Sequence, residues 1–223
     1  MACIWLAMEL NRNITVSAAE DFATIEPKIL YFGTPVAIVS SINPDGSANL
    51  APISSFWALG WTLVLGLLRD TKTLANLEER ADCVVNIPSP ELWTRVEKLA
   101  PLTGLDPVPE EKAAKFRYEP DKFAAAGLTP LESECVAAPR VLECPAQLEA
   151  RVNKIHSLVG ERRLGQLTGG AAVEVAVVRV HVRRDFLMKE NYVDPAHWQP
   201  LIYNFRHYHG LSGELGKTFR AEV

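Results

Sequence analysis

Three polar residues at the predicted start of a helix could bind a phosphate group. Thr71, Lys72 and Thr73 follow an apolar run and begin a segment of helical spacing. A helix that begins there presents free backbone N–H groups and the positive end of its dipole. With two hydroxyls, one ammonium and Arg69 just before the turn, the segment is a candidate site for a phosphate monoester. The alternative is an ordinary capped helix with a solvated lysine.

A second candidate segment, residues 49–55, lies at the end of a predicted strand. It reads Asn-Leu-Ala-Pro-Ile-Ser-Ser, and small residues and proline at a strand end let a flat ligand approach the backbone closely. Ser54 and Ser55 could supply hydrogen-bond donors to the polar edge of a ring. The alternative is a strand that leaves a hairpin into a serine-rich turn.

Several other chemistries have no support in the sequence. It contains no GxGxxG, GxxxxGK[ST], GxSxG or HExxH motif, which disfavours the common nucleotide folds, α/β-hydrolases and zinc proteases. His207 and His209 place two imidazoles on one face of an extended segment, but no third ligand is in view, so we expect no metal site. The four cysteines show no CxxC spacing, and we expect reduced thiols in a cytoplasmic protein.

The elements that must position the two candidate segments are mostly strands. A β-branched run and its return are joined by Asn43-Pro44-Asp45-Gly46, a strong hairpin signal. The first half of the chain predicts strands over residues 35–42, 47–53, 61–67 and 82–87, and a helix over residues 71–80. The second half predicts helices over residues 90–99 and 121–126, an irregular segment over 101–120, strands over 147–152 and 173–182, and a short helix from Asp194. Strands joined by turns more often than by long helices favour an antiparallel barrel with peripheral helices. The predicted fold is therefore mainly β.

Composition limits the class of protein. The chain has 223 residues, of which 48% are hydrophobic and 22% charged, and its formal net charge is −4. These values exclude a disordered chain and give no field that would attract nucleic acid. No stretch approaches the ~20 apolar residues that span a bilayer, so we expect no membrane association. We expect one domain over residues 1–223, with residues 1–20 as a loose N-terminal extension.

The two candidate segments occur in an order that resembles a known family. A hairpin with an Asp-Gly turn, the sequence N-x-A-P-x-S-x-F from Asn49, the Asp70-Thr71 helix start and the strand Cys83-Val84-Val85-Asn86 stand in succession. This arrangement is similar to the flavin reductase-like family, whose members have an FMN-binding split β-barrel fold. A weaker match continues through Asp121-Lys122-Phe123 to His207-Tyr208.

The resemblance implies an FMN site built from the two segments. One part would line the isoalloxazine, with Asn49, Leu50, Ala51, Pro52, Ser54 and Ser55. The other would hold the phosphate, with Arg69, Thr71, Lys72, Thr73 and Asn76. The resemblance also implies a homodimer and hydride transfer from NADH or NADPH to the flavin. Electrons would then pass to a second flavin, oxygen or a protein such as a monooxygenase. Because the flavin carries this chemistry, no catalytic side chain is expected.

Two alternatives to a reductase remain open. The segment 167–175 lacks a histidine that many reductases of this family carry, which favours an FMN-binding electron carrier without nicotinamide activity. A flavin-free barrel that binds another phosphorylated ligand, such as pyridoxal phosphate, is the third reading.

The aromatic C-terminal segment also has two interpretations. Tyr203, Phe205 and Tyr208 lie close together in the sequence, with histidines beside Tyr208. His207 and Tyr208 could shape a substrate pocket beside the flavin, or the segment could simply seal the barrel.

Overall fold

The computed structural model describes residues 22–159 and 169–218. The chain divides into two units, residues 1–30 and residues 31–223. Of the first unit only residues 22–30 are described, and they contain no helix or strand. The predicted N-terminal extension, residues 1–20, and residues 160–168 lie outside the described residues. None of the helices in the described part is long and apolar enough to cross a membrane.

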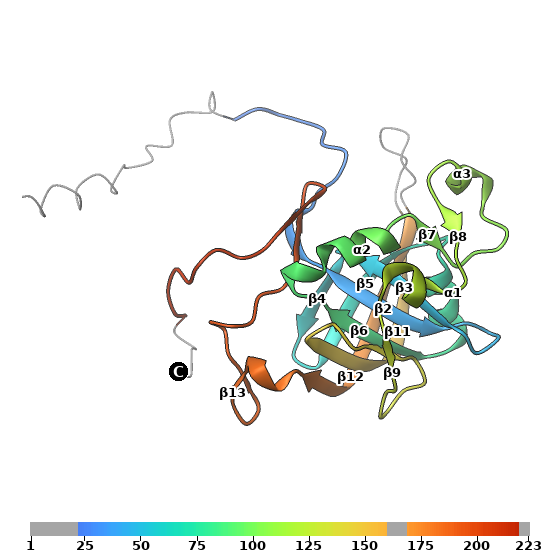
Figure 1. The fold of residues 1–223 in the computed structure, drawn as a ribbon. Helices are drawn as coiled ribbons and strands as arrows, with labels where there is room; N and C mark the ends of the chain where they lie inside the picture. Colours follow the sequence, from blue (N-terminus) through green and yellow to red (C-terminus); the bar gives the residue numbers. More distant parts are fainter. Residues whose placement is uncertain (1–21, 160–168, 219–223) are drawn as a thin grey trace, which may run out of the picture. The chain divides into compact units, whose positions relative to one another are not determined.

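A seven-stranded antiparallel sheet forms the centre of the second unit (Figure 1). In spatial order it runs β3-β2-β6-β11-β12-β5-β4. The strands are β2 (Ala37–Ile42), β3 (Ala48–Ile53), β4 (Phe56–Leu59), β5 (Thr62–Leu68), β6 (Asp82–Ile87), β11 (Ala146–Val159) and β12 (Gly169–Val182). The sheet is strongly curved and its two edges, β3 and β4, are not paired with each other, so the barrel is open on one side. The prediction of a mainly β protein with peripheral helices is confirmed.

The first hairpin follows directly from its turn residues. The Gly46 amide donates to the Asn43 carbonyl at 2.9 Å, and Gly46 has a φ of 86°, a conformation that glycine adopts without strain. Asp45 accepts hydrogen bonds from the Ser47 amide and hydroxyl. These contacts fix the register in which Ser41 faces Asn49 across β2 and β3.

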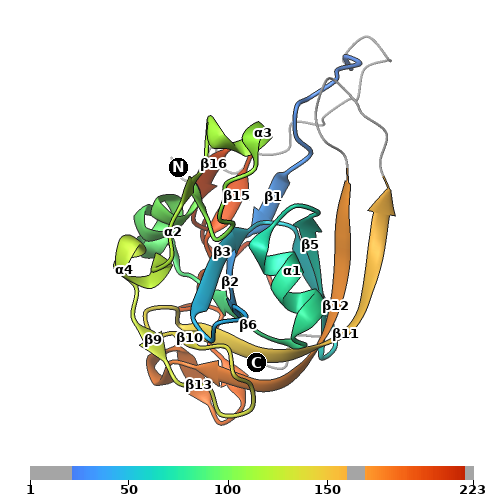
Figure 2. The same ribbon diagram turned by 90° about the vertical axis from the view of Figure 1, so that its right-hand side faces the viewer.

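Helix α1 (Lys72–Glu79) lies across the open side of the barrel (Figure 2). It contacts β2, β3 and β5, which belong to opposite ends of the sheet order. Leu74 and Leu77 are buried in the main core, with Val85, Val173 and other apolar residues of the sheet. The helix therefore fills the gap between the two edges, as its apolar spacing predicts.

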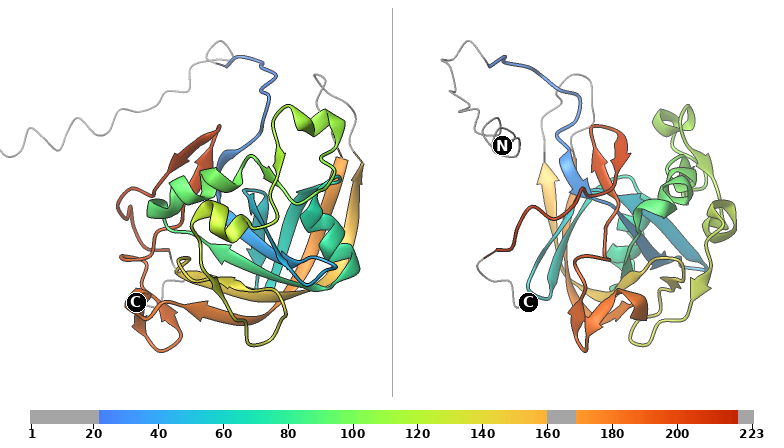
Figure 3. Two further views of the ribbon diagram at one scale, coloured as in Figure 1. Left: turned by 45° about the vertical axis from the view of Figure 1, so that its right-hand side comes forward. Right: turned by 60° about the vertical axis from the view of Figure 1, so that its left-hand side comes forward.

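A second core includes Leu50 of β3 and residues of two short helices, Val96 and Phe123 among them. These helices lie on the outer side of the sheet (Figure 3). Helices α2 (Trp93–Leu99) and α4 (Lys122–Ala126) both pack against β3. Gly127 ends α4 in the left-handed conformation, as its position predicts. The remaining helical turns are η2 (Pro90–Leu92), α3 (Glu110–Ala113) and η3 (Arg184–Phe186).

The other strands are short. A three-stranded sheet joins β1 (Phe32–Pro35), β15 (Ile202–Asn204) and β16 (His207–His209). Three further pairs are β7 (Leu102–Thr103) with β8 (Arg117–Tyr118), β9 (Pro130–Leu131) with β10 (Arg140–Val141), and β13 (Leu187–Lys189) with β14 (Tyr192–Val193).

Several short elements were not predicted from the sequence, and two differences have a clear physical reason. Strand β4 was not predicted, because its edge position leaves Trp57 and Leu59 exposed and gives no clear alternation. The helix expected from Asp194 is a single turn instead. Asp194 accepts hydrogen bonds from the Ala196 amide through its carboxylate and from the Trp198 amide through its carbonyl, and Pro200 follows two residues after Trp198. Proline restricts the residue before it to extended backbone, which stops the turn from continuing.

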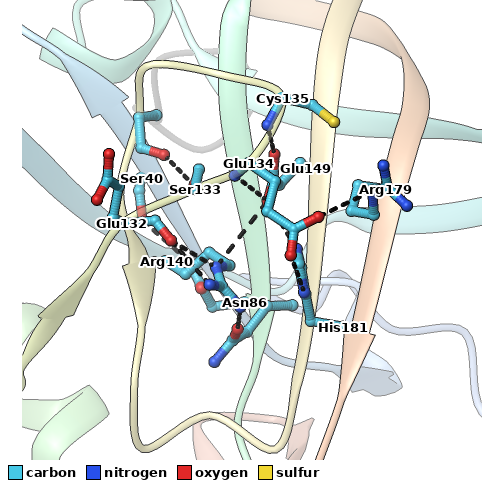
Figure 4. A network of polar contacts seen from close by, with 12 residues as sticks. Ser40, Asn86, Glu132, Ser133, Glu134, Cys135, Arg140, Glu149, Arg179 and His181 are labelled. Atoms are coloured by element: carbon cyan, nitrogen blue, oxygen red, sulfur yellow. Dashed lines mark hydrogen bonds and ion pairs between the residues drawn. The ribbon is translucent and has the colours of Figure 1, made fainter.

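A buried carboxylate network fastens the loop after β9 to the sheet (Figure 4). Glu149 on β11 is fully buried and accepts hydrogen bonds from the backbone amides of Glu134 and Cys135. His181 Nε2 lies 2.7 Å from its Oε1 atom. Burial acts to raise the pKa of Glu149, but these hydrogen bonds outweigh it and lower the pKa below its ordinary value. None of these residues lines the cavity described below.

Candidate functional site: a cavity at the open side of the barrel

A cavity of about 410 Å³ lies between the two edges of the sheet and the start of α1. Its volume is within the range of small-molecule and cofactor sites, about 300–1,000 Å³. One wall comes from the end of β3 and the following turn, and β5 contributes Gly66, Leu67 and Leu68. Opposite lie α2, the loop after β7, and the aromatic C-terminal hairpin, which contribute Val96, Leu102, Gly104, Tyr203 and Tyr208.

The beginning of α1 supplies the polar end of the cavity. Thr71 caps the helix, since its hydroxyl oxygen accepts a hydrogen bond from the Leu74 amide at 3.3 Å. Lys72 and Thr73 follow in the first turn, and all three residues line the cavity. Amides in the first turn of a helix have no acceptor within the helix, so this end of the cavity favours an anion.

The end of β3 supplies a flat, narrow wall. Ala51, Pro52, Ser54 and Ser55 all line the cavity, and Pro52 lies on an edge strand as expected. The Tyr31 hydroxyl lies 2.6 Å from Ser55 Oγ. A Cβ atom on Gly66 would lie 2.8 Å from Ser55 Cβ, so only glycine permits this close approach of β5.

Four of the residues predicted to bind the cofactor do not line the cavity. Leu50 is buried in the second core, and Asn49 lies behind the wall. Arg69 instead donates to Ser157 Oγ at 2.7 Å. Asn76 donates to Ser41 Oγ and Asn43 Oδ1, so it ties α1 to the first hairpin.

A buried lysine that the sequence reading did not assign completes the polar end. The side chain of Lys122 lines the cavity, although only 4% of the residue is exposed to solvent. Its ammonium donates to Asn49 Oδ1 at 2.8 Å and to the Leu50 carbonyl at 2.9 Å. Within the described residues its third hydrogen has no acceptor. Burial lowers the pKa of Lys122 to about 8, against the opposing effect of Glu119.

Asn49 does not line the cavity but contacts two residues that do, Thr73 and Lys122. Its amide nitrogen donates to Thr73 Oγ1 at 3.0 Å, while its oxygen accepts from Lys122. A Cβ atom on Gly104 would lie 2.7 Å from Asn49 Oδ1 and 2.9 Å from Lys72 Cγ. A glycine at position 104 thus leaves room for both side chains. In the sequence, Lys122 is marked only by the Asp121-Lys122-Phe123 segment of the weaker family match. In the structure Asp121 caps α4.

The C-terminal hairpin brings Tyr208 to the cavity but leaves His207 outside it. The Tyr208 hydroxyl donates to Glu97 Oε2 at 3.0 Å, and its ring lies 5.9 Å from that of Tyr203. Burial, together with the hydrogen bond to Glu97, raises the pKa of Tyr208 above its ordinary value. Tyr208 also packs against the second core, so it contacts both the cavity and this core.

Comparison with known proteins agrees with this geometry. The sequence model of the flavin reductase like domain matches residues 29–212. The chain belongs to the flavin reductase-like family. It is 42% identical to the uncharacterized protein YdfE of Bacillus subtilis (strain 168) over 204 residues, which cover 91% of this chain and 95% of YdfE.

Several solved structures share the fold of this chain. Flavoredoxin of Desulfovibrio vulgaris (Miyazaki F) matches with a TM-score of 0.70 at 21% identity, covering 90% of this chain and 98% of flavoredoxin. Nitrilotriacetate monooxygenase component B from Bacillus cereus matches with a TM-score of 0.69 at 20% identity, covering 88% and 98%. A Shewanella frigidimarina NCIMB 400 protein described as having a split barrel domain matches with a TM-score of 0.65 at 16% identity, covering 85% and 87%. The predicted family and split-barrel fold are confirmed.

The residues of the cavity fit a flavin. A flavin combines a flat aromatic ring with a polar chain. The β3 wall and the apolar residues opposite it suit the ring, and the amide-rich, cationic end suits the chain. The buried Lys122 ammonium has two acceptors among the described residues, for three hydrogens, and it is the group that most requires a polar ligand there.

Proposed function

We propose that this protein is an FMN-dependent oxidoreductase of the flavin reductase type. It would take hydride from NADH or NADPH and pass electrons to a second flavin, oxygen or a partner monooxygenase. One observation carries this proposal. A single cavity joins an apolar slot to a polar end that holds three lysines, Lys72, Lys112 and Lys122, and the free amides of α1.

The polar end supports FMN over riboflavin. Lys72 and Lys122 are cations at the same end of the cavity, and a phosphate monoester carries a charge of about −1.5 to −2 at neutral pH. Thr71 and Thr73 bring hydroxyls and first-turn amides to the same end. These residues would hold the phosphate, while Ala51, Pro52 and the two serines after β3 would face the isoalloxazine.

The protein's contribution to the reaction is binding and orientation. The flavin, when bound, accepts a hydride and afterwards gives up its electrons. The chain supplies a slot whose apolar residues, Val36, Leu67 and Val96, exclude water from the ring. The Bacillus cereus protein with the same fold is named as a monooxygenase component, which supports a partner enzyme as the electron acceptor. A cytoplasmic homodimer is part of the same proposal.

An FMN-binding electron carrier is the second candidate. Among the described residues no histidine lines the cavity, and this favours a site that holds a flavin without handling nicotinamide. One of the solved structures with the same fold is named flavoredoxin, which is consistent with an electron-carrier role.

Two measurements on the purified protein test the proposal. First, flavin fluorescence is followed as apoprotein is titrated into FMN and into riboflavin. We expect FMN to bind at least about tenfold more tightly, because a charge-assisted hydrogen bond contributes about 1.5–3 kcal/mol. Equal affinities would remove the phosphate site from the proposal.

The second measurement mixes the FMN-loaded protein with NADH or NADPH without oxygen in a stopped-flow instrument. Bleaching of the flavin absorbance supports a reductase. Retention of the colour with both donors supports the electron carrier. A protein that binds neither flavin would contradict both candidates.

A further inference from the structure

A second hollow lies directly behind Tyr208, outside the flavin cavity. Its volume is about 480 Å³, and it is formed by the start of α2 and by the β15–β16 hairpin. We call it the outer hollow; its wall includes Pro90, Trp93, Glu97, Arg206, His207 and Tyr208. Tyr208 lines both spaces, so the outer hollow and the flavin cavity share this residue in their walls.

The hairpin that forms one wall has an unusual turn. Phe205 and Arg206 are its two central residues, and both have positive φ angles, 44° and 68°. Two-residue hairpins of this kind normally carry Asn-Gly or Asp-Gly, because other residues are strained there. The strained turn is held by Phe205, whose ring packs 4.6 Å from that of Phe32 and whose amide donates to the Tyr31 carbonyl. The turn therefore places Arg206, an exposed residue, in the wall of the outer hollow.

The side chains of the outer hollow combine aromatic surface with positive charge. Trp93 is 49% exposed, and its ring lies 6.2 Å from that of Tyr208. In the described part of the chain, Arg206 has no ion-pair partner, and His207 and His209 lie beside it. Glu97 is the one carboxylate in the wall, and it already accepts the Tyr208 hydroxyl. An aromatic base bearing phosphate groups matches this arrangement, since guanidinium binds phosphate and indole stacks on a base.

We propose that the outer hollow binds the adenosine diphosphate half of the dinucleotide donor, so that the dinucleotide spans Tyr208. This inference rests on the proposed function, because it requires the nicotinamide half of the same dinucleotide to reach the flavin cavity. Trp93 stacks against the adenine, and Arg206 binds the phosphates. Tyr208, held in place by Glu97, is the positioning residue between the two halves.

The direct test uses ADP, which contains the proposed anchoring half and cannot reduce flavin. Isothermal titration of ADP into the FMN-loaded protein should show saturable binding. Arg206→Gln should weaken that binding about tenfold, the loss expected for one charge-assisted contact, and Trp93→Leu should weaken it severalfold. The matched control is Arg184→Gln, an exposed arginine that lines a different hollow. FMN affinity should stay unchanged in all three variants, which shows that they are folded.

Steady-state kinetics give an independent readout. ADP should compete with NADH or NADPH, and Arg206→Gln should raise KM for the donor much more than it lowers kcat. If ADP neither binds nor competes, the inference is wrong, whatever the reductase assay shows. If ADP binds and depends on Arg206 but the donors do not bleach the flavin, the proposed reductase activity is wrong and the assignment of the outer hollow stands as a nucleotide site.

Discussion

The two walls of the flavin cavity are built in different ways. One wall consists of residues 51–55 and 71–73, two segments close in the sequence that a hairpin and one helix bring together. The other wall consists of Gly104, Lys122 and the tyrosines of the C-terminal hairpin, which are distant from the first wall and from each other. The first wall can be recognised from a local sequence motif. The second wall forms only when distant parts of the chain fold back to the open side of the barrel.

The difference is also electrostatic. Lys72 in the first wall lies at a partly exposed helix start, while Lys122 in the second is almost fully buried. A buried ammonium interacts more strongly with a ligand anion than an exposed one does, because water screens it less. We therefore expect the second wall to contribute more to FMN affinity, and the predictions below test this order.

The largest effect is expected for Lys122→Met. The substitution keeps an unbranched apolar stem and removes a buried charge, so FMN affinity should fall about a hundredfold, the upper end for a charge-assisted contact of about 3 kcal/mol. Riboflavin affinity, followed by the same fluorescence titration, should change little. Lys115→Met, at an exposed lysine outside the cavity, is the matched control. If the two lysine variants bind FMN equally well, the second wall does not hold the phosphate.

Gly104→Ala should have the next largest effect. The new Cβ atom would lie within 3 Å of both Asn49 and Lys72, so one of them must move from its position beside the cavity. Overpacking of this kind costs about 1–3 kcal/mol, which predicts an FMN affinity lower by about tenfold or more. Gly213→Ala, where a Cβ atom meets nothing within 4 Å, is the control. An unchanged dissociation constant for Gly104→Ala would show that the loop after β7 adjusts freely.

The affinity for FMN should also depend on pH. The pKa of Lys122 is lowered to about 8 by burial, and a phosphate monoester, with a second pKa of about 6, is already dianionic there. As pH rises above about 8, unliganded Lys122 loses the proton that the phosphate requires. FMN affinity should then fall by up to about tenfold per pH unit, and binding should take up protons from the buffer. Lys122→Met should abolish this dependence, and a wild-type affinity that is flat with pH would contradict the assignment.

These predictions also indicate what the sequence could and could not supply. The hairpin, α1 and the residues after β3 follow from local signals, such as the Asn43–Gly46 turn and the Thr71 cap. The position of Asn49 could not be predicted, since whether it faces the ligand or Lys122 depends on a helix much later in the chain. The same holds for Tyr208. The sequence shows an aromatic residue there, but it does not predict that the Glu97 carboxylate accepts a hydrogen bond from the Tyr208 hydroxyl.

Lys72→Ala tests the first wall. Because this lysine lies at a partly exposed anion site, its charge is partly screened, and we expect FMN affinity to fall about tenfold, the lower end for a charge-assisted contact. The thermal stability of the apoprotein should not change, since the Thr71 cap and the buried face of α1 remain. An affinity loss larger than that of Lys122→Met would reverse the order of the two walls.

The smallest effect is expected for Tyr208→Phe. The ring remains against Tyr203 and Trp93, so the cavity keeps its shape, and FMN affinity should stay within about twofold of wild type. The lost hydrogen bond to Glu97 should lower the free energy of unfolding by about 1 kcal/mol, measured by denaturant titration of the apoprotein. Tyr208→Ala separates packing from polarity, because it also removes the ring that both lines the cavity and covers the second core. If Tyr208→Ala lowers stability by several kcal/mol while the rate of flavin reduction per FMN-loaded molecule is unchanged, Tyr208 only seals the barrel. A slower reduction rate in Tyr208→Ala but not in Tyr208→Phe would instead show that the ring positions the donor.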